Sequence, residues 1–370
     1  MPLRRRTFLA AGAAPVLAAA AASAPSVRVA LLVEPAGDHL EHYFRAALCD
    51  GVSEFAIADA TGETFEAAEK AAAVAGNRRV VRFRDPAHMM ASFRPHLAVI
   101  SQVPRSMPAA IELAVSGGAH VVVEKPGCAT LPAFERAVRR AQSAGREVML
   151  AMASRLYPEA EQIRTLIGTG RLGKLYSADM QWIADQTRLK NPAYHRSWKA
   201  SRSLGGGGKL IFHGIHYLDL IASLTGASVA EVAAFCRNVG GQPIEVEDAA
   251  VLAMTFSSGM VGTLNTGYYL DKGYANRIAL WGSEGWVRFE PHADLTLAWQ
   301  SSAAGAPAGI QELRRAATEK VNVYHLMLQA AVDFARGARR PFITSAESVA
   351  ALKAVFAAYR SAAAGTAQKV

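Results

Sequence analysis

Short apolar runs alternate with amphipathic segments from Val27 to Pro126, and this alternation constrains the fold more than any other feature. The successive segments read VRVALLV, HLEHYFRAALC, FAIAD, TFEAAEKAAAVAG, RVVRF, DPAHMMASF, HLAVI, SMPAAIELAVSGG and HVVVEKP. β-Branched runs separated by helices of about three turns predict a parallel sheet wound on both faces, the α/β class. Ligands of such a sheet bind at the carboxyl ends of its strands.

The turn after the first expected strand departs from the usual dinucleotide-binding pattern. The segment LLVEPAGDHLEHYF stands where G-x-G-x-x-G would let the backbone approach a pyrophosphate at a helix N-terminus. Val33, Pro35 and Asp38 fill the three glycine positions, and Gly37 is the one glycine nearby. Asp59, 22 residues beyond Gly37, can accept hydrogen bonds from ribose hydroxyls and favours NAD over NADP. The alternative is an aspartate that caps a helix.

The first 25 residues have the three parts of an export signal. MPLRRRTFLAAGAAPVLAAAAASAPSV begins with arginines, continues with an apolar stretch and ends in small residues. The paired arginines before x-Phe-Leu predict a twin-arginine signal peptide over residues 1–25, hence a periplasmic or otherwise exported protein with no stable membrane anchor after cleavage. A disordered alanine-rich tail and an uncleaved anchor are the alternatives.

Composition excludes several other classes. The net charge of +9 comes from basic residues scattered among acidic ones, which does not predict a nucleic-acid surface. The cysteines, Cys49, Cys128 and Cys236, form no C-x-x-C site or paired framework. An apolar fraction of 51% without a later membrane-spanning run predicts a soluble protein.

The EKP sequence at Glu124, Lys125 and Pro126, followed some 80 residues later by a glycine run and G-x-H-x-x-D, resembles the Gfo/Idh/MocA family of oxidoreductases. The resemblance continues through RLYPEAEQIRTLIGTGRLGKLYSADMQW, GGGGKLIFHGIHYLDLIASLTG and VEDAAVLAMTFSSGMVGTLNTGYY. It implies a Rossmann doubly wound parallel sheet over residues 26–150, which binds NAD, and a C-terminal α+β domain over residues 151–370. The latter carries an open, mostly antiparallel sheet that can pair two copies of the chain.

The resemblance also implies the catalytic residues. Family members transfer a hydride between a sugar or cyclitol carbon and the nicotinamide ring. Lys125 matches a lysine that contacts the reacting hydroxyl, and His216 matches the catalytic histidine, whose ordinary pKa suits a proton acceptor. The family has an aspartate four residues before this histidine, and Phe212 stands there.

Other polar residues are candidates for the orienting role that an aspartate would have had. On a helix of 100° per residue, His213 and Asp219 lie to either side of His216 on one patch, and Asp185 and Tyr194 precede them in a loop. His213 could instead be a buried core residue, and two histidines with one aspartate lack a sharp metal-ligand spacing, so no metal is expected. The cofactor-binding candidates are Gly37, Asp59, Glu124, Lys125 and Pro126.

Aromatic and charged residues in NPAYHRSWKASRS are suited to line a carbohydrate site. Tyr194, Trp198 and Lys199 offer ring faces and donors, and Arg155 and Tyr157 offer a second, weaker set. The glycines at 205–208 predict either a hinge or a close approach of the backbone to ligand or cofactor.

Three functions follow from these features. The first is an exported NAD-dependent oxidoreductase that acts on a sugar, sugar derivative or cyclitol with a tightly bound cofactor. The second is a redox-neutral, NAD-dependent glycosidase, which needs a second base such as Tyr194 or Asp185. The third is an inactive binding or scaffold protein, consistent with the residues at the glycine positions and at Phe212.

Overall fold

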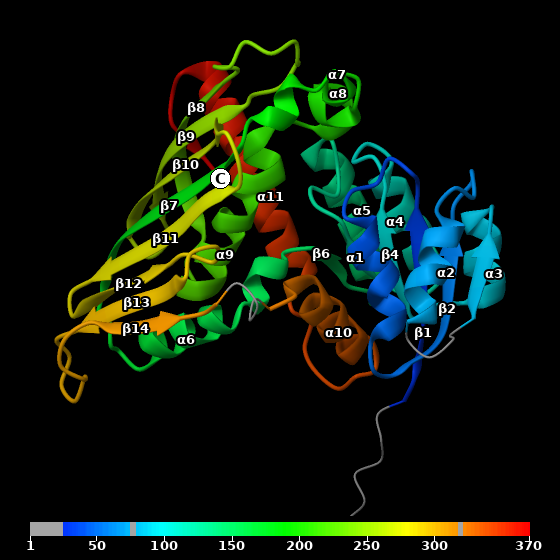
Figure 1. Cartoon of the computed structure of the whole chain (residues 1–370), viewed down its shortest axis with the longest axis horizontal. Coiled ribbons are helices and arrows are strands. Elements are labelled where there is room, and N and C mark those ends of the chain that lie inside the picture. The colour runs from blue at the N-terminus through cyan, green and yellow to red at the C-terminus, as the bar shows by residue number, and fades with distance from the viewer. Residues whose placement is uncertain (1–24, 75–78, 317–320) are drawn as a thin grey trace, which may run out of the picture.

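The structure is a computed structural model of the chain, and it describes residues 25–74, 79–316 and 321–370. The predicted signal peptide lies outside the described residues, apart from residue 25. Two sheets dominate the fold (Figure 1), one in each half of the chain.

The first sheet is six-stranded and entirely parallel, in the order β3-β2-β1-β4-β5-β6. This is the doubly wound Rossmann order, and its topological switch point lies between β1 and β4. The predicted class is confirmed. The strands are β1 (Val27–Val33), β2 (Val52–Ala58), β3 (Val80–Phe83), β4 (Leu97–Ser101), β5 (His120–Val123) and β6 (Val148–Leu150).

Helices cover both faces of this sheet, so the central strands β1 and β4 are buried along nearly their whole length. The helices and short helical turns of this half are α1 (Leu40–Tyr43), η1 (Phe44–Leu48), α2 (Phe65–Ala73), α3 (Pro86–Phe93), α4 (Met107–Ser116) and α5 (Leu131–Ser143). The carboxyl ends of β1, β4 and β5 therefore open toward the second half of the chain.

The second sheet has nine strands in the order β14-β13-β12-β11-β7-β10-β9-β8-β15, and it is antiparallel except where β10 pairs with β7. Its strands alternate buried and exposed residues, as in β9 and β10, because only one face is covered. They are β7 (Leu175–Asp185), β8 (Val229–Arg237), β9 (Ala249–Phe256), β10 (Val261–Leu270), β11 (Tyr274–Gly282), β12 (Gly285–Phe289), β13 (Leu295–Ser301), β14 (Gln311–Arg314) and β15 (Gln368–Lys369).

The helices of the second half join the two sheets. In Figure 1, α11 runs between the sheets and α10 returns to the Rossmann side. The helices and turns are η2 (Ala153–Leu156), α6 (Pro158–Gly168), η3 (Thr187–Lys190), α7 (Pro192–His195), η4 (Trp198–Ala200), α8 (Arg202–Gly205), η5 (Leu210–Gly214, a π-helical turn), α9 (Ile215–Thr225), α10 (Val323–Ala335) and α11 (Ser345–Ala364).

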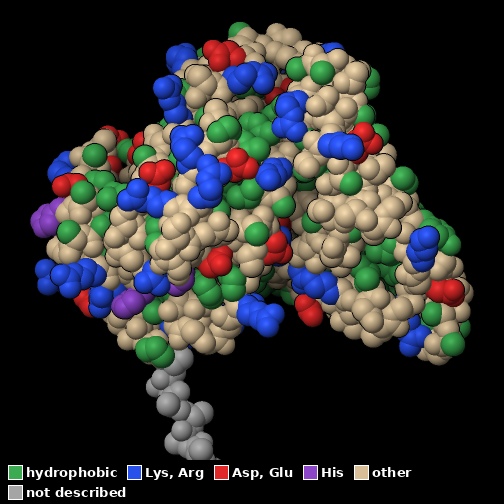
Figure 2. All heavy atoms as spheres, turned by 180° about the vertical axis from the view of Figure 1, so that it is seen from behind, with side chains coloured by type: hydrophobic (Ala, Val, Ile, Leu, Met, Phe, Trp, Pro, Cys, Tyr) green, Lys and Arg blue, Asp and Glu red, His purple; other side chains and the backbone are tan. Residues whose placement is uncertain are grey.

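Charged side chains are spread over the surface. On the face seen in Figure 2, Lys and Arg lie on both lobes with Asp and Glu among them. Of the helices in the described part of the chain, none combines the length and the apolar character needed to cross a bilayer.

Candidate active site

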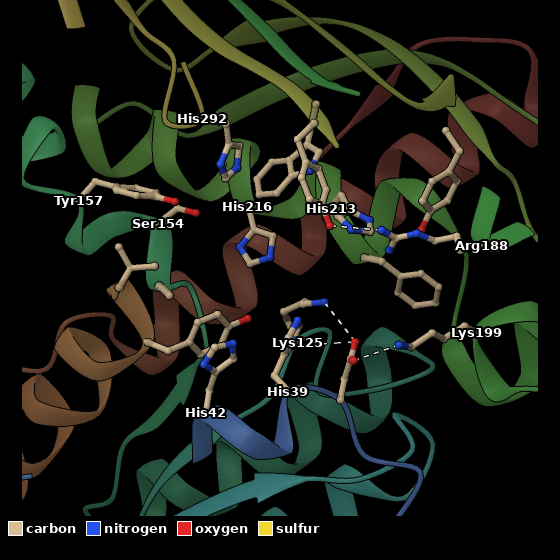
Figure 3. A pocket seen from close by; sticks show the side chains of 18 of the residues that line it. His39, His42, Lys125, Ser154, Tyr157, Arg188, Lys199, His213, His216 and His292 are labelled. Carbon is tan, nitrogen blue, oxygen red and sulfur yellow. Dashed lines mark hydrogen bonds and ion pairs between the residues drawn. The ribbon is translucent and has the colours of Figure 1, made fainter. Parts of the chain in front are cut away.

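A cavity of about 570 Å³ lies between the two halves, at the carboxyl ends of the Rossmann strands (Figure 3). Both halves contribute polar and aromatic side chains to it. The lining residues are Asp38, His39, His42, Lys125, Ala153, Ser154, Tyr157, Trp182, Arg188, Tyr194, Lys199, Phe212, His213, His216, Tyr268, Tyr274, His292, Val323 and Tyr324.

Lys125 reaches this cavity from the end of β5. The Lys125–Pro126 peptide bond is cis, and the lysine side chain is only 5% exposed. Its Nζ lies 3.6 Å from Oε1 of Glu124 and 3.9 Å from Oδ2 of Asp38. Two carboxylates therefore hold the ammonium at the cavity wall.

Glu124 is fully buried behind this lysine. The hydroxyl of Tyr43 donates to its carboxylate, and Nδ1 of His39 lies 3.2 Å from Oε2. Glu124 thus positions the lysine and the helix that follows β1, and it is absent from the cavity lining.

His216 faces Lys125 from the first turn of α9 (Figure 3). Its ring stacks on Trp182 with a centroid distance of 5.1 Å, and its Nδ1 has no hydrogen-bond partner among the described residues. Burial, followed by the positive charge of Lys125, lowers the pKa of His216 well below its usual value. The imidazole is therefore neutral near pH 7 and able to accept a proton.

The expected carboxylate partner of His216 is missing. Both oxygens of Asp219 bind Arg155 instead, at 2.8 Å from Nε and 2.7 Å from Nη2, and Arg155 also bonds Glu347 at 2.9 Å. The predictions that Asp219 orients His216 and that Arg155 binds substrate are therefore wrong. This bidentate pair is buried and ties η2 to α9 and α11.

Four of the other candidates line the cavity, and two do not. Tyr157, Tyr194, Lys199 and His213 are lining residues. Asp185 accepts from the backbone N–H of Thr187 at 2.7 Å and lies outside the lining, so its predicted role is not supported. Trp198 is also outside the lining, and its Nε1 donates to the backbone oxygen of Ala36 at 2.8 Å.

His213 lies beside His216 without a hydrogen bond between them. Its ring contacts Trp182 and Tyr268 at centroid distances of 5.7 Å each, and Nδ1 has no partner among the described residues. Burial and then Lys209 and Lys125 lower the pKa of His213 well below its usual value. The imidazoles of His213 and His216 are therefore both neutral near pH 7.

The turn after β1 packs tightly against β4. A Cβ on Gly37 would collide with the backbone oxygen of Ser101, so this glycine permits contact with the protein's own backbone. The Glu34 carboxylate accepts from the backbone N–H of Val103. The turn thus spans the switch point, where a dinucleotide lies in Rossmann folds.

The carboxylates of Asp38 and Glu34 occupy the hydrogen-bond donors at this turn. Lys199 Nζ lies 3.0 Å from Oδ1 of Asp38. Although burial opposes it, the charges of Lys125, His39 and Lys199 lower the pKa of the Asp38 carboxyl. The Lys199 ammonium and the Val103 N–H could bind a nucleotide phosphate once Asp38 and Glu34 release them.

Asp59 uses its carboxylate locally. Its Oδ1 accepts from the N–H and hydroxyl of Thr61 at 3.0 and 2.9 Å, and its Oδ2 accepts from the same groups of Thr64 at 2.9 and 2.8 Å. The side chain is buried, and the four hydrogen bonds that it accepts use all the lone pairs of its carboxylate. These contacts fit the alternative of an aspartate at the start of a helix better than that of an aspartate free to bind a ribose.

The glycines at 205–208 serve internal packing. A Cβ on Gly208 would collide with the backbone oxygen of Glu247, and one on Gly207 with the hydroxyl of Tyr359. The Glu247 carboxylate accepts from the N–H of Gly208 and of Leu210, each at 3.0 Å, and from the Tyr359 hydroxyl at 2.7 Å. The prediction that the backbone at 205–208 closely approaches a ligand is wrong, because the atoms next to these glycines belong to the protein itself.

Several site residues were not predicted from the sequence. Three interior strands of the second sheet, β7, β10 and β11, contribute Trp182, Tyr268 and Tyr274, and the η3 turn after β7 contributes Arg188. Lys209 is a charged residue inside an apolar helical run, and that contrast was the available signal. In residues 25–74, 79–316 and 321–370, no three His, Cys, Asp or Glu side chains are grouped to hold a metal ion.

The fold and the cavity define a two-domain α/β protein with a dinucleotide-binding first domain. The chain belongs to the Gfo/Idh/MocA family of oxidoreductases. The family profile described as the NAD-binding Rossmann fold matches residues 22–152, and the profile of the GFO/IDH/MocA C-terminal domain matches residues 160–288. The protein is thus an oxidoreductase-family member with an NAD-binding Rossmann domain.

Curated relatives are distant. The 1,5-anhydro-D-fructose reductase of Ensifer adhaerens is 25% identical over 268 residues, 70% of this chain and 74% of the reductase. Uncharacterized proteins of Sinorhizobium fredii and Synechocystis, also 25% identical, are matched over 41% and 48% of their own lengths. The chain therefore spans less than half of these two relatives.

Solved structures share the fold over nearly the whole chain. The WlbA dehydrogenase of Bordetella pertussis in complex with NADH and UDP-GlcNAcA is 21% identical, with a TM-score of 0.78 over 94% of this chain and 99% of that one. Levoglucosan dehydrogenase in complex with NADH is 18% identical, with a TM-score of 0.79 over 93% and 99%.

Proposed function

We propose that the protein is an NAD-dependent oxidoreductase that transfers a hydride between the cofactor and a hydroxyl-bearing carbon of a sugar, sugar derivative or cyclitol. The observation that carries this proposal is the meeting of Lys125 and His216, from different halves of the chain, across one cavity at the dinucleotide-binding edge. The reductase of E. adhaerens and levoglucosan dehydrogenase, whose names refer to sugar compounds, support the substrate class.

Lys125 and His216 have different roles at the substrate hydroxyl. Bound NAD supplies the hydride acceptor. His216 takes the hydroxyl proton, and its neutral state near pH 7 suits that role. The Lys125 ammonium lies beside the same oxygen and stabilises the negative charge that develops there. Trp182 orients the imidazole by stacking, in place of a carboxylate.

Export is part of the proposal. The arginine-containing start of the sequence predicts a twin-arginine signal over residues 1–25. A protein outside the cytoplasm has no free nicotinamide pool, so we propose that NAD is bound before export and regenerated in place. The C-terminal sheet is the surface through which we expect two copies to pair.

Redox-neutral glycoside cleavage is a second candidate, and one observation favours it. That reaction needs a base for a C–H proton in addition to the base for the hydroxyl. Burial raises the pKa of Tyr194 to about 12, which makes it a poor base, and Asp185 lies outside the lining. His213, a neutral imidazole on the cavity wall beside His216, is the better second base.

The experiment is to express the full chain in the cytoplasm, purify it, denature a portion and measure released NAD. The remaining portion is incubated with sugars, cyclitols and aryl glycosides while NADH absorbance and aglycone release are followed. Lys125→Ala and His216→Ala should each lower turnover by about 10²–10⁴-fold, whereas His88→Ala, on the exposed helix α3, should not.

The outcomes separate the three functions. NADH formation with a sugar supports the oxidoreductase, and aglycone release without net NADH supports the glycosidase. A folded protein that neither retains nor binds added NAD refutes both and leaves the scaffold function. Full activity in His216→Ala would remove His216 from the reaction.

A further inference from the structure

The cavity has more positive than negative side chains. Lys125, Arg188 and Lys199 line it, and Asp38 is the one carboxylate in the lining. Asp38 is already shared between Lys199 at 3.0 Å and Lys125 at 3.9 Å. Arg188 has no carboxylate within ion-pair distance in the described part of the chain.

Arg188 is held in place by aromatic residues of the second sheet. Its guanidinium carbon lies 5.5 Å from the ring centroid of Tyr268, and Nη2 donates to the Tyr274 hydroxyl at 3.3 Å. In Figure 3 it lies on the opposite side of the cavity from Tyr157, with His216 and His213 between them. A planar guanidinium in this position can bind a carboxylate through two N–H groups.

Lys209 adds a second basic group behind the wall. It is fully buried, its Nζ has no hydrogen-bond partner, and that atom lies 4.4 Å from the ring centroid of the same Tyr268. The buried carboxylate of the adjoining segment, Glu247, is occupied by backbone N–H groups and a tyrosine hydroxyl. A buried amine without a partner is costly unless a ligand supplies an acceptor or a negative charge.

The groups around Lys209 are also basic or neutral. Arg188 comes from η3, Lys125 from β5, His213 from the same helical segment and Tyr268 from β10. Burial, then Arg188 and Lys125, lowers the pKa of Lys209 to about 6. The amine is thus neutral near pH 7 in the free protein, and a nearby anion would raise its pKa.

We propose that Arg188, with Lys209 behind Tyr268, forms an anion-binding end of the substrate site, and that the substrate is a carboxylate-bearing sugar such as a uronic acid. This inference rests on the proposed function, because it orients the sugar with its carboxylate at Arg188 and its reacting carbon between Lys125 and His216. The Arg188 guanidinium, held by Tyr268 and Tyr274, can bind the two oxygens of a carboxylate through two parallel N–H···O bonds.

Arg188 is also distinct from the groups that contact the dinucleotide turn. Trp198 and Lys199 make those contacts, to Ala36 and Asp38. Arg188 is instead fixed by the tyrosines of β10 and β11. Its replacement should therefore leave cofactor binding intact.

The test is calorimetric titration of the NAD-loaded full chain with D-glucuronate and D-galacturonate, each paired with its neutral sugar, and with glucose 6-phosphate. We expect at least one uronate to bind about tenfold or more tightly than its neutral counterpart. Arg188→Met should abolish this preference and retain NAD. Lys190→Met, an exposed lysine of the same turn, should preserve it.

Proton uptake gives a separate measure of Lys209. Titration at about pH 7.5 in buffers of different ionisation enthalpy should show that the protein takes up about half a proton or more per bound uronate. The reason is that the charge of the uronate raises the pKa of the amine. Lys209→Met should bind the uronate without this uptake. Zero uptake in the unaltered protein would overturn the part assigned to Lys209.

Four results would overturn the carboxylate site. They are equal affinity for uronates and neutral sugars, no binding of any uronate, tighter binding of glucose 6-phosphate than of glucuronate, and loss of NAD from Arg188→Met. Turnover of neutral sugars without a uronate preference would refute this inference and keep the proposed function. A uronate preference in a protein that never retains NAD would support the carboxylate site and refute the proposed function.

Discussion

The burial of Lys209 makes a quantitative prediction about stability and pH. Its pKa is about 6 in the folded protein and 10.5 as the reference value. Between these values the unfolded chain binds about one more proton than the folded chain, so the free energy of unfolding rises with pH by about 1.4 kcal/mol per unit. From about pH 7 to about pH 9 the gain is roughly 2.5 kcal/mol.

Lys209→Met removes this dependence and keeps most of the apolar stem. At about pH 7 the buried amine costs the native protein roughly 3–5 kcal/mol, so the variant should be more stable than the unaltered protein. The advantage should shrink by roughly 2.5 kcal/mol at about pH 9. Other titrating groups contribute equally to both proteins and cancel in the difference.

The assay is equilibrium urea unfolding followed by tryptophan fluorescence, at matched ionic strength and with NAD removed from both proteins. Lys190→Met serves as the control, because this lysine is exposed and its replacement should leave the pH dependence unchanged. Parallel stability curves for the unaltered protein and Lys209→Met between about pH 7 and about pH 9 would refute a neutral buried amine.

Three further predictions concern other parts of the structure. Phe212→Asp should restore a carboxylate near His216 and move the acid limb of kcat/KM upward by about one pH unit; an unchanged pH profile would contradict this. Asp219→Asn should lower the free energy of unfolding by about 3 kcal/mol, since Arg155 loses its buried partner, and should leave kcat of the folded protein unchanged; loss of kcat without destabilisation would instead place Asp219 in the chemistry. Phe235→Lys, at a side chain that is 69% exposed on β8, should shift assemblies toward monomers in sedimentation velocity; an unaltered distribution would argue against pairing through this sheet.

The fold was largely predictable because burial on both faces leaves a clear pattern in the sequence. The parallel strands before Pro126 read as continuous apolar runs, and the helical segments between them predict crossover connections. The antiparallel strands β9 and β10 alternate buried and exposed residues, and that period was also visible. The meeting of Lys125 and His216 required the family resemblance, because nothing local in either segment predicts their separation in space.

The errors concern side chains whose partners are distant in the sequence. Asp219 lies on the same helical patch as His216, but the helix geometry could not show that Arg155, 64 residues earlier, would bind both of its oxygens. Arg188 was not predicted as a site residue, because its proposed role depends on the lack of a carboxylate partner among the described residues. Such an absence can be recognised only once the cavity is assembled.

Phe212, where the family resemblance places an aspartate, and Lys209 both affect the charge of the segment that leads to His216. The first removes a negative charge from the helix that carries His216, and the second adds a basic group one turn before His213. Near pH 7 the buried Lys209 amine is neutral, and keeping it neutral costs the native fold stability. In the proposed site an anionic substrate raises the pKa of Lys209, so the amine that lowers the stability of the free protein contributes to the binding specificity.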